Sequence, residues 1–261
     1  MGRILKASFI DHFSKQADDY ARYRPLYPAT LYEYLASLTP EHERAWDVGT
    51  GNGQAAIGLA QHFRSINATD PSERQIALAT PYDRVTYRVA LAKDSGLDDQ
   101  SIDLITAAQA VHWFDLDRFY AEARRVLRSP DAVSGKPHGI LAVWCYGLTE
   151  ITPEVDRVMA SFYRDVLGEF WPPQIHWVDE HYRTLPFPFD ELTPPEFVVE
   201  ARWTLDDLFG YLNSWSATQK FLEARGYEPL GHVRNDFTAA WGTEHDRVVR
   251  WPIYLRVGQT R

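Results

Sequence analysis

A glycine-rich turn near residue 50 is the stretch of the chain best suited to do chemistry. It lies between a strand-like and a helix-like run and has glycine at three alternate positions, Gly49, Gly51 and Gly53. Glycines let the backbone approach a ligand, and the helix N-terminus that follows offers free N–H groups. Asp70 ends the next strand-like run about 20 residues later, where a carboxylate can accept hydrogen bonds from both ribose hydroxyls. The pattern predicts a site for a nucleoside-containing cofactor.

Details of the turn distinguish two cofactor classes. A dinucleotide site requires Gly-x-Gly-x-x-Gly, and in either register the third glycine is missing, because those positions hold Gln54 and Ala56. Asp47 stands two residues before the first glycine, where its carboxylate would repel a pyrophosphate and attract an ammonium or a sulfonium. The turn therefore favours S-adenosylmethionine, which has an amino acid and a positive sulfur in place of phosphates. The alternative is a tight turn whose glycines serve packing alone, and it leaves the spacing to Asp70 unexplained.

Composition restricts the partners and the compartment. A net charge of −9 over 261 residues argues against a nucleic-acid partner, which would require a basic face. The single cysteine, Cys145, excludes an internal disulfide and a cysteine-based zinc cluster, and no metal is expected. There is no apolar leader and no apolar run long enough to cross a membrane. We expect a cytoplasmic monomer or homodimer that acts on a small molecule.

The segments around the turn predict a sheet that positions it. Strand-like and helix-like runs alternate up to residue 144, which is typical of one parallel, doubly wound α/β sheet. Ser72 is expected to cap the helix that follows the second strand, with Gln75 completing a capping box. The expected elements are strands at 44–48, 64–70, 85–89, 101–109 and 139–144, and helices at 29–38, 54–62 and 116–127.

Further candidate site residues follow the ends of the third and fourth strands. Ligands gather at the carboxyl edge of an open parallel sheet, so Ala92 and Lys93 are expected in a loop that forms a wall for the adenine ring. Gln109 ends the fourth strand, and His112 and Trp113 follow it at the same edge. For His112 the alternative is a buried structural histidine. Its position beside the proposed cleft favours a role in the site.

The N-terminal segment contains a cluster of tyrosine and arginine residues. Tyr20, Arg22 and Arg24 precede the first strand and could form a lid, with Tyr20 on the cofactor and Arg22 or Arg24 holding a carboxylate of the substrate. The alternative is an N-terminal helix packed on the sheet edge with solvated arginines.

The pattern changes after the fifth strand. Residues 146–200 hold a helix near 154–167 and a stretch rich in proline and aromatic residues, which we expect to cover the cleft and shape the substrate pocket. Tyr146 and the later Trp215 are expected to contact the substrate, together with Trp113 and Arg24. Strands are predicted at 197–203 and 248–257. We expect one domain over 1–261, divided into lid helices at 1–40, a cofactor-binding core at 41–145, a cap at 146–200 and the C-terminal part of the sheet at 201–261.

With these residues in place, the chain resembles the class I S-adenosylmethionine-dependent methyltransferases. The residues that carry this resemblance are Asp47-Val48-Gly49-Thr50-Gly51-Asn52-Gly53, Asp70, Ala92-Lys93 and Gln109. Outside that core, three segments resemble the small-molecule branch related to trans-aconitate methyltransferases, namely Tyr20-x-x-Tyr23-Arg24-Pro25-x-Tyr27-Pro28, Ala110-Val111-His112-Trp113-Phe114 and Ser214-Trp215-Ser216-Ala217.

The resemblance implies a Rossmann-like, mostly parallel sheet of seven strands, with the last strand antiparallel and a substrate-capping insertion after strand 5. It further implies cofactor contacts from Tyr20, Asp47, Gly49, Gly51, Asp70, Gln75, Ala92, Lys93 and Gln109. Gly49 and Gly51 would line the methionine moiety, and Gln109 would lie beside the sulfonium. Many relatives have an acid where Lys93 stands, so the contact to the adenine amino group is expected from Asp94 or a backbone carbonyl.

The expected reaction is methyl transfer to a small molecule, with S-adenosylhomocysteine as the product. A carboxylate acceptor needs no base, and His112 would then be a hydrogen-bond donor or a wall. A hydroxyl acceptor would use His112 as general base. O-methylation is favoured, with a carboxylate preferred because of Arg22, Arg24 and the resemblance. The alternatives are a cofactor-binding protein without catalysis, a methyltransferase acting on RNA or protein and, least favoured, a nicotinamide oxidoreductase.

Overall fold

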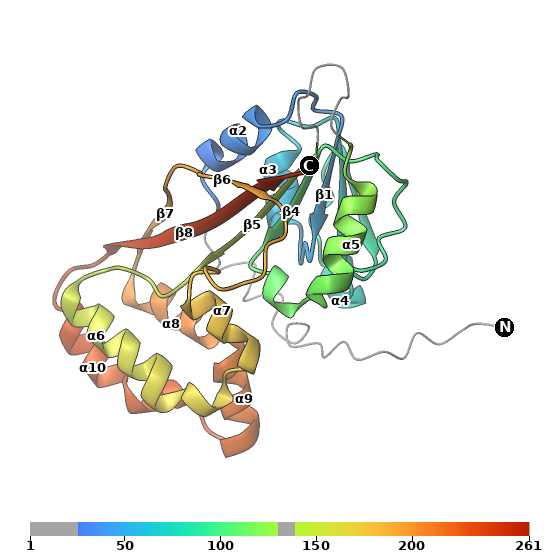
Figure 1. Ribbon diagram of the computed structural model, residues 1–261. Coiled ribbons are helices and arrows are strands. Elements are labelled where there is room, and N and C mark those ends of the chain that lie inside the picture. Colours follow the sequence, from blue (N-terminus) through green and yellow to red (C-terminus); the bar gives the residue numbers. More distant parts are fainter. Residues whose placement is uncertain (1–25, 130–138, 261) are drawn as a thin grey trace.

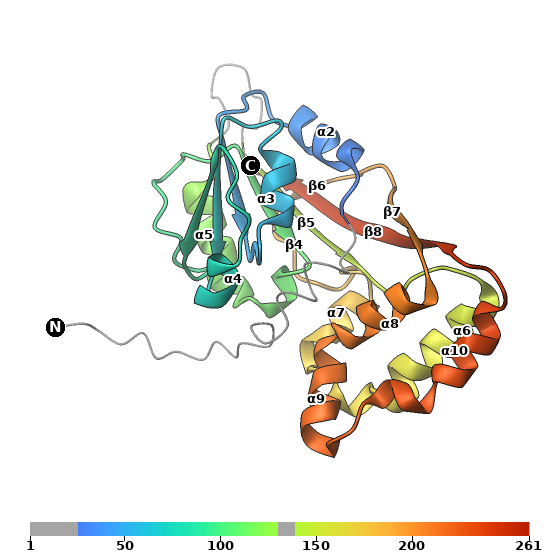
Figure 2. The same ribbon diagram turned by 180° about the vertical axis from the view of Figure 1, so that it is seen from behind.

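An eight-stranded, mostly parallel β-sheet forms the centre of the molecule (Figures 1 and 2). The structure is a computed structural model that describes residues 26–129 and 139–260. The strand order is β3-β2-β1-β4-β5-β8-β6, and β7 also pairs with β8. Strands β1 to β5 run parallel, and β8 is antiparallel to β5, β6 and β7. The strands are β1 (Arg44–Val48), β2 (Ser65–Asp70), β3 (Val85–Val89), β4 (Leu104–Ala108), β5 (Ile140–Tyr146), β6 (Asp190–Leu192), β7 (Phe197–Trp203) and β8 (Arg247–Gln259).

The predicted doubly wound α/β sheet with an antiparallel last strand is confirmed, but the expected number of strands, seven, is one too low. The additional strand is β6, whose three residues pair with the end of β8. A segment this short has no alternation that a sequence pattern could reveal, because strand periodicity needs at least four residues.

Helices cover both faces of the sheet. Apolar residues of α2 and α3, such as Leu31 and Leu59, pack with Ile66 of the sheet on one face. On the other face, α5 presents Phe119 and Val126 to a second cluster. The helices are α2 (Ala29–Ser37), α3 (Gln54–Leu59), α4 (Glu73–Ala77), α5 (Leu116–Val126), α6 (Pro153–Ser161), α7 (His176–Asp179), α8 (Leu205–Asn213), α9 (Ser216–Arg225) and α10 (Arg234–Trp241).

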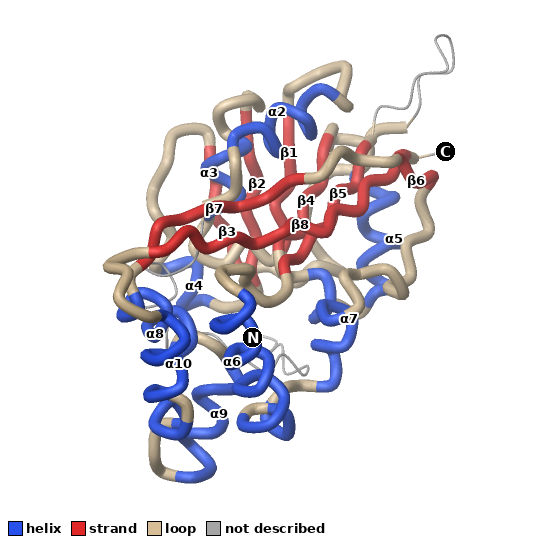
Figure 3. The backbone as a smooth tube through the Cα atoms, turned by 90° about the vertical axis from the view of Figure 1, so that its left-hand side faces the viewer, coloured by secondary structure: helices blue, strands red, loops and turns tan. Residues whose placement is uncertain are grey.

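The helices α6 to α10, with the short helical turns between α6 and α7 and between α9 and α10, form a separate helical layer, which we call the cap. Figure 3 shows the cap below the sheet. The insertion expected at 146–200 supplies only α6 and α7, whereas α8, α9 and α10 come from the segment that was expected to complete the sheet. They join the cap because their apolar sides pack there: the Phe162 ring, which follows α6, stacks on Trp215 and contacts Phe237 edge-on.

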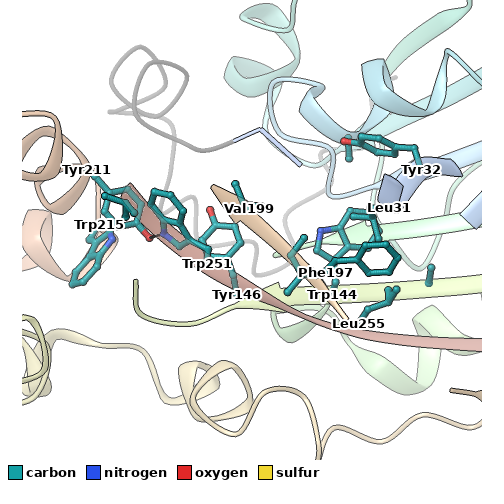
Figure 4. Packing of buried hydrophobic residues seen from close by; sticks show 14 of the residues in the cluster. Leu31, Tyr32, Trp144, Tyr146, Phe197, Val199, Tyr211, Trp215, Trp251 and Leu255 are labelled. Carbon is teal, nitrogen blue, oxygen red and sulfur yellow. Dashed lines mark hydrogen bonds between the residues drawn. The ribbon is translucent and has the colours of Figure 1, made fainter. Parts of the chain in front are cut away.

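The last strand connects the cap with the sheet. Residues 253–259 of β8 pair with β5, and residues 247–253 pair with β7, which leads into α8. One hydrophobic cluster follows the same path. Figure 4 shows it running from Leu31 and Trp144 through Trp251 to Tyr211 and Trp215 in the cap. The sheet and the cap therefore share a core, which fixes the cap relative to the carboxyl edge of the sheet.

Candidate functional site

A cavity of about 850 Å³ lies between the carboxyl edge of the parallel strands and the cap. Its volume is typical of ligand sites, which range over about 300–1,000 Å³. The predicted cofactor residues within the described part of the chain all line it: Asp47, Gly49, Gly51, Asp70, Gln75, Ala92, Lys93 and Gln109. His112 and the predicted substrate residues Trp113, Tyr146 and Trp215 line it as well. The predicted residues Tyr20 and Arg24 lie outside the described residues.

The glycine turn between β1 and α3 has the left-handed conformation that favours glycine, with φ of 68° at Gly49 and 55° at Gly51. The two positions have different surroundings. A Cβ atom on Gly49 would lie 2.6 Å from the Cβ of Ala110, whereas the nearest atom to one on Gly51 would be Gln75 Oε1 at 3.9 Å. The turn therefore packs tightly at Gly49 and leaves open space at Gly51, where a ligand can approach the backbone.

Asp70 links the end of β2 to the glycine turn. Its Oδ2 accepts a hydrogen bond from the Gly51 N–H at 3.0 Å, and its Oδ1 accepts one from the Ser72 N–H at 2.9 Å. Each carboxylate oxygen can accept more than one hydrogen bond, so ligand hydroxyls can bind to the same group. Ser72 caps α4 by accepting from the Gln75 N–H, as the sequence predicted.

Asp47 is a buried residue of β1, two positions before Gly49 of the glycine turn. Its Oδ1 accepts from the Thr106 hydroxyl at 2.7 Å and its Oδ2 from the Thr50 hydroxyl at 2.5 Å. Burial raises the pKa of Asp47 to about 6, although the two hydroxyl groups counteract this. At neutral pH the group is therefore a buried anion, and a cationic ligand group nearby would be attracted to it.

Gln109 directly follows β4 in a strained conformation for a residue with a side chain, with φ of 53°. Its backbone N–H donates to the Trp144 carbonyl at 2.9 Å, and its Nε2 donates to the Tyr146 carbonyl at 3.0 Å. The buried Oε1 accepts no hydrogen bond from the described residues. A buried amide oxygen in this state is available to a ligand, because leaving it unsatisfied is costly.

The loop after β3 is fixed to α5. Glu122 accepts from the N–H and the hydroxyl of Ser95, at 2.9 and 2.5 Å. Ala92 and Lys93 line the cavity, whereas Asp94 is exposed and is not part of the lining. Of the two groups expected to replace the missing acid near adenine, the geometry therefore favours a backbone carbonyl over Asp94.

His112 belongs to a short 3-10 helix, Val111–Trp113, and is buried. Its Nδ1 lies 2.6 Å from the hydroxyl oxygen of Tyr182, which comes from the loop after α7. Burial lowers the pKa of His112 to about 3, so the imidazole is neutral at physiological pH. Tyr182 was not a predicted site residue. It stands 70 positions from His112 in the sequence, and no local pattern connects the two.

The cap contributes an aromatic wall, which we define as Tyr163, Trp171, Tyr211 and Trp215. The ring centroids of Trp171 and Trp215 are 5.5 Å apart, and those of Tyr163 and Trp171 are 4.7 Å apart. All four residues line the cavity. Only Trp215 was predicted as a site residue, because the placement of the other three depends on packing between distant segments.

Lys220 also lines the cavity, on the same side of α9 as Ser216. Burial lowers its pKa, and the negative charge of Glu223 on the same helix counteracts this. Two acids of the lining have other partners: Asp179 accepts from the Tyr163 hydroxyl at 2.6 Å, and Glu169 pairs with Arg225 at 2.8 Å. Lys220 thus adds a basic side chain to the lining on the cap side of the cavity. Its spacing from Trp215 and Ser216 is the only sequence signal that could have indicated it.

Residues 26–129 and 139–260 contain no group of three or more histidine, cysteine or acidic side chains suited to a metal ion. They also contain no helix that is long and apolar enough to span a membrane.

Comparisons with known proteins agree on one family. The model of a family described as "Methyltransferase domain" matches residues 46–131. The chain is 31% identical to a "Putative methyltransferase" of Dictyostelium discoideum over 255 residues, covering 95% of this chain and 94% of that protein. It is 25% identical to a "Probable S-adenosylmethionine-dependent methyltransferase" of Saccharomyces cerevisiae, covering 63% and 58% of the two chains. The solved structure of a "Putative Type II Methyltransferase" from Anaeromyxobacter dehalogenans superposes with a TM-score of 0.81 at 45% identity, covering 91% of this chain and 98% of that one.

Proposed function

Because this chain belongs to the class I S-adenosylmethionine-dependent methyltransferases, we propose that it methylates an oxygen atom of a small anionic molecule held under the cap. The observation that carries the proposal is that one cavity is lined by residues at or after the carboxyl ends of β1 to β5 and also by the aromatic wall and Lys220. The sheet side suits the cofactor and the cap side suits the acceptor.

The sheet side fits the cofactor in charge and shape. Gly51 leaves space beside the backbone for the methionine moiety, and Asp47 supplies negative charge for its ammonium and sulfonium groups. Asp70 would accept from the ribose hydroxyls, and the backbone near Ala92 would contact adenine. Gln109 Oε1, which has no partner among the described residues, would lie beside the sulfonium. When bound, the cofactor supplies an electrophilic methyl carbon on a positively charged sulfur.

The cap side favours an anion with an apolar body. Aromatic faces alone would also suit a cationic acceptor, because cations are attracted to aromatic rings. Lys220 argues against a cationic acceptor, because it places a basic side chain in the lining of the cavity. A carboxylate would pair with Lys220 while its apolar part packs on the aromatic wall. Trp113 and Tyr146, which also line the cavity, complete the acceptor region in this proposal.

Positioning is the main task of the protein in such a reaction. An in-line displacement requires the acceptor oxygen, the methyl carbon and the sulfur to be aligned, and alignment of this kind can contribute about 7–11 kcal/mol. The aromatic wall excludes water and limits the orientations of the acceptor. Lys220 would fix its anionic group.

The proposal is tested with methyl-labelled cofactor and a panel of small carboxylic acids, their amides and phenols. We expect label to enter the acids and to be released as methanol by mild alkali, as a methyl ester requires. Incorporation into amines, RNA or protein in place of small acids would contradict the proposal. Cofactor binding without turnover on any acceptor would favour a binding protein.

A matched variant separates the two sides of the cavity. Lys220→Met should raise KM for the acid acceptor about tenfold or more, as expected for the loss of a hydrogen bond to a charged group, and leave the affinity for S-adenosylhomocysteine unchanged. An unchanged KM in this variant would remove the argument for an anionic acceptor.

A further inference from the structure

The contact between Tyr182 and His112 determines which ring nitrogen of the histidine holds the proton. The two side chains are buried, with Tyr182 0% exposed, and the distance from Nδ1 to the hydroxyl oxygen is 2.6 Å. The Tyr182 hydroxyl oxygen also accepts a hydrogen bond from the backbone N–H of His112. Among the residues that the structure describes, the hydroxyl proton has no acceptor other than His112 Nδ1, and His112 Nε2 has no hydrogen-bond partner. The Tyr182 hydroxyl proton can therefore be hydrogen-bonded only if His112 Nδ1 accepts it.

Only one arrangement of protons meets that requirement. If Nδ1–H donated to the tyrosine oxygen, the buried hydroxyl proton would have no acceptor, which is unfavourable. If the hydroxyl donates to a bare Nδ1, both groups are satisfied. A neutral imidazole then holds its proton on Nε2, and burial, which lowers the pKa of His112 to about 3, keeps the ring neutral.

The backbone around Tyr182 is held in a conformation that residues with side chains rarely adopt. Both His181 and Tyr182 have φ of 57°. Arg256 of β8 donates through Nη1 to the carbonyls of Tyr182 and Leu185, at 3.0 and 2.6 Å, and the His181 ring stacks on Tyr254 with centroids 3.5 Å apart. Strain that is maintained by several contacts concentrates at functional sites. The contacts fix the tyrosine hydroxyl opposite His112.

We propose that Tyr182 is a positioning residue that fixes His112 as a neutral Nε2–H donor to the acceptor oxygen, and that the acceptor therefore enters the site as an anion. This inference rests on the proposed function. His112 lines the cavity, and Nε2 is its remaining polar atom. A nitrogen that already holds its proton cannot remove one from a hydroxyl acceptor.

The reaction balances without a base. A lone pair of the carboxylate oxygen forms the new O–C bond while the electron pair of the C–S bond goes to sulfur. The acceptor becomes a neutral ester, the sulfonium becomes a neutral thioether, and no proton is released. A hydroxyl acceptor would release one proton, and the fixed tautomer of His112 has no site to receive it.

The tautomer is measured directly by NMR. In long-range ¹H–¹⁵N spectra of the full-length protein, we expect the His112 signals of an Nε2–H tautomer at neutral pH. The assignment uses the loss of these signals in a His112→Gln variant. A proton on Nδ1 in the wild-type protein would overturn the proposal, and this readout requires neither cofactor nor acceptor.

Variants test the donor role by activity. Glutamine can donate from its amide but cannot serve as a base, whereas alanine can do neither. We expect His112→Gln to retain kcat/KM within about tenfold of the wild type and His112→Ala to lose about 100-fold, the range of a hydrogen bond to a charged group. Equal losses in both variants would indicate a base and overturn the proposal.

Tyr182→Phe should allow the ring to populate both tautomers and should raise KM for the acid more than it lowers kcat. Tyr120→Phe is the matched control, because Tyr120 is also buried and donates to the carbonyl of Pro186 in the same loop. Tyr120→Phe should leave the His112 spectrum unchanged. If Tyr182→Phe does not fold, the wild-type spectrum and the His112 pair still decide the question. Failure of every small acid as a substrate would instead contradict the proposed function and leave the tautomer result intact.

Discussion

The protonation state of the buried Asp47 carboxylate affects both the stability of the fold and the binding of a cationic ligand. In the unfolded chain the group titrates near its ordinary pKa of 3.8, and burial raises the folded value to about 6. Between these values the folded state binds the proton more tightly than the unfolded state does. The contribution of Asp47 to stability therefore falls as the pH rises from about 4 to about 6 and stays constant above that range.

This gives a prediction about ligand binding. A cationic ligand group near Asp47 favours the charged carboxylate, so the affinity for S-adenosylmethionine should rise as the pH increases through about 6. Calorimetric titrations over pH 5 to 8 would measure this change. Asp47→Asn should have a flatter profile and weaker binding, with an unchanged or higher melting temperature. A pH profile identical to that of the wild type would contradict the role of Asp47.

Asp70 gives a second prediction at the residue scale. Asp70→Ala removes the carboxylate that would accept from the ribose, so the affinity for S-adenosylhomocysteine should fall about 10- to 100-fold, as expected for hydrogen bonds to a charged group. Asp94→Ala is the control, because Asp94 is exposed and lies outside the cavity lining. Its affinity should match the wild type. Unchanged affinity in Asp70→Ala would remove the ribose assignment.

At the scale of the element, the glycine turn performs two tasks at neighbouring positions. Gly49→Ala should destabilise the protein, because its Cβ would contact Ala110 at 2.6 Å with φ of 68°. Gly51→Ala has the same unfavourable backbone region but open space for its Cβ, so it should lose less stability and more cofactor affinity. Chemical denaturation and calorimetry of the two variants would compare them. If the two variants lost stability and cofactor affinity in the same proportion, the assignment of packing to Gly49 and ligand approach to Gly51 would be contradicted.

The elements on the sheet side of the cavity could be predicted because their signals are local. β1, β3 and β7 have the predicted bounds. The candidates Asp70 and Gln109 line the cavity, and the sequence indicated them because each lies at or directly after a strand end. The helix predicted at 154–167 is α6 followed by a π-helical turn at Phe162–Val166, a change in hydrogen bonding that periodicity does not reveal.

The cap side could not be predicted in the same way. Lys220 lines the cavity and Tyr182 contacts His112 only after segments distant in the sequence pack together, so no local pattern connects either residue with the strand ends. The extent of the cap could not be predicted for the same reason, because the place of α8 to α10 beside α6 depends on contacts such as that between Phe162 and Phe237.

At the scale of the whole molecule, the shared core predicts that the sheet and the cap unfold together. One hydrophobic cluster contains residues of both, including Trp144 and Trp215, and β8 pairs along its length with strands that reach each part. Denaturant unfolding followed by tryptophan fluorescence and by far-ultraviolet circular dichroism should give coincident transitions. S-adenosylhomocysteine at 100 times its Kd should add about 2.7 kcal/mol to the stability. A separate early transition of the cap would contradict the shared core.

The pairing of β5 with β8 also means that β5 is synthesised long before its partner strand. The predicted cofactor residues are all synthesised by Gln109 and β5 by Tyr146, but the edge of β5 stays unpaired until Arg247–Gln259 have left the ribosome. An open edge beside buried apolar strands is a template for pairing with other chains. During translation, the nascent protein therefore has a partly assembled sheet with an unpaired edge at β5. Chaperones that cover such edges would act between the synthesis of β5 and that of β8.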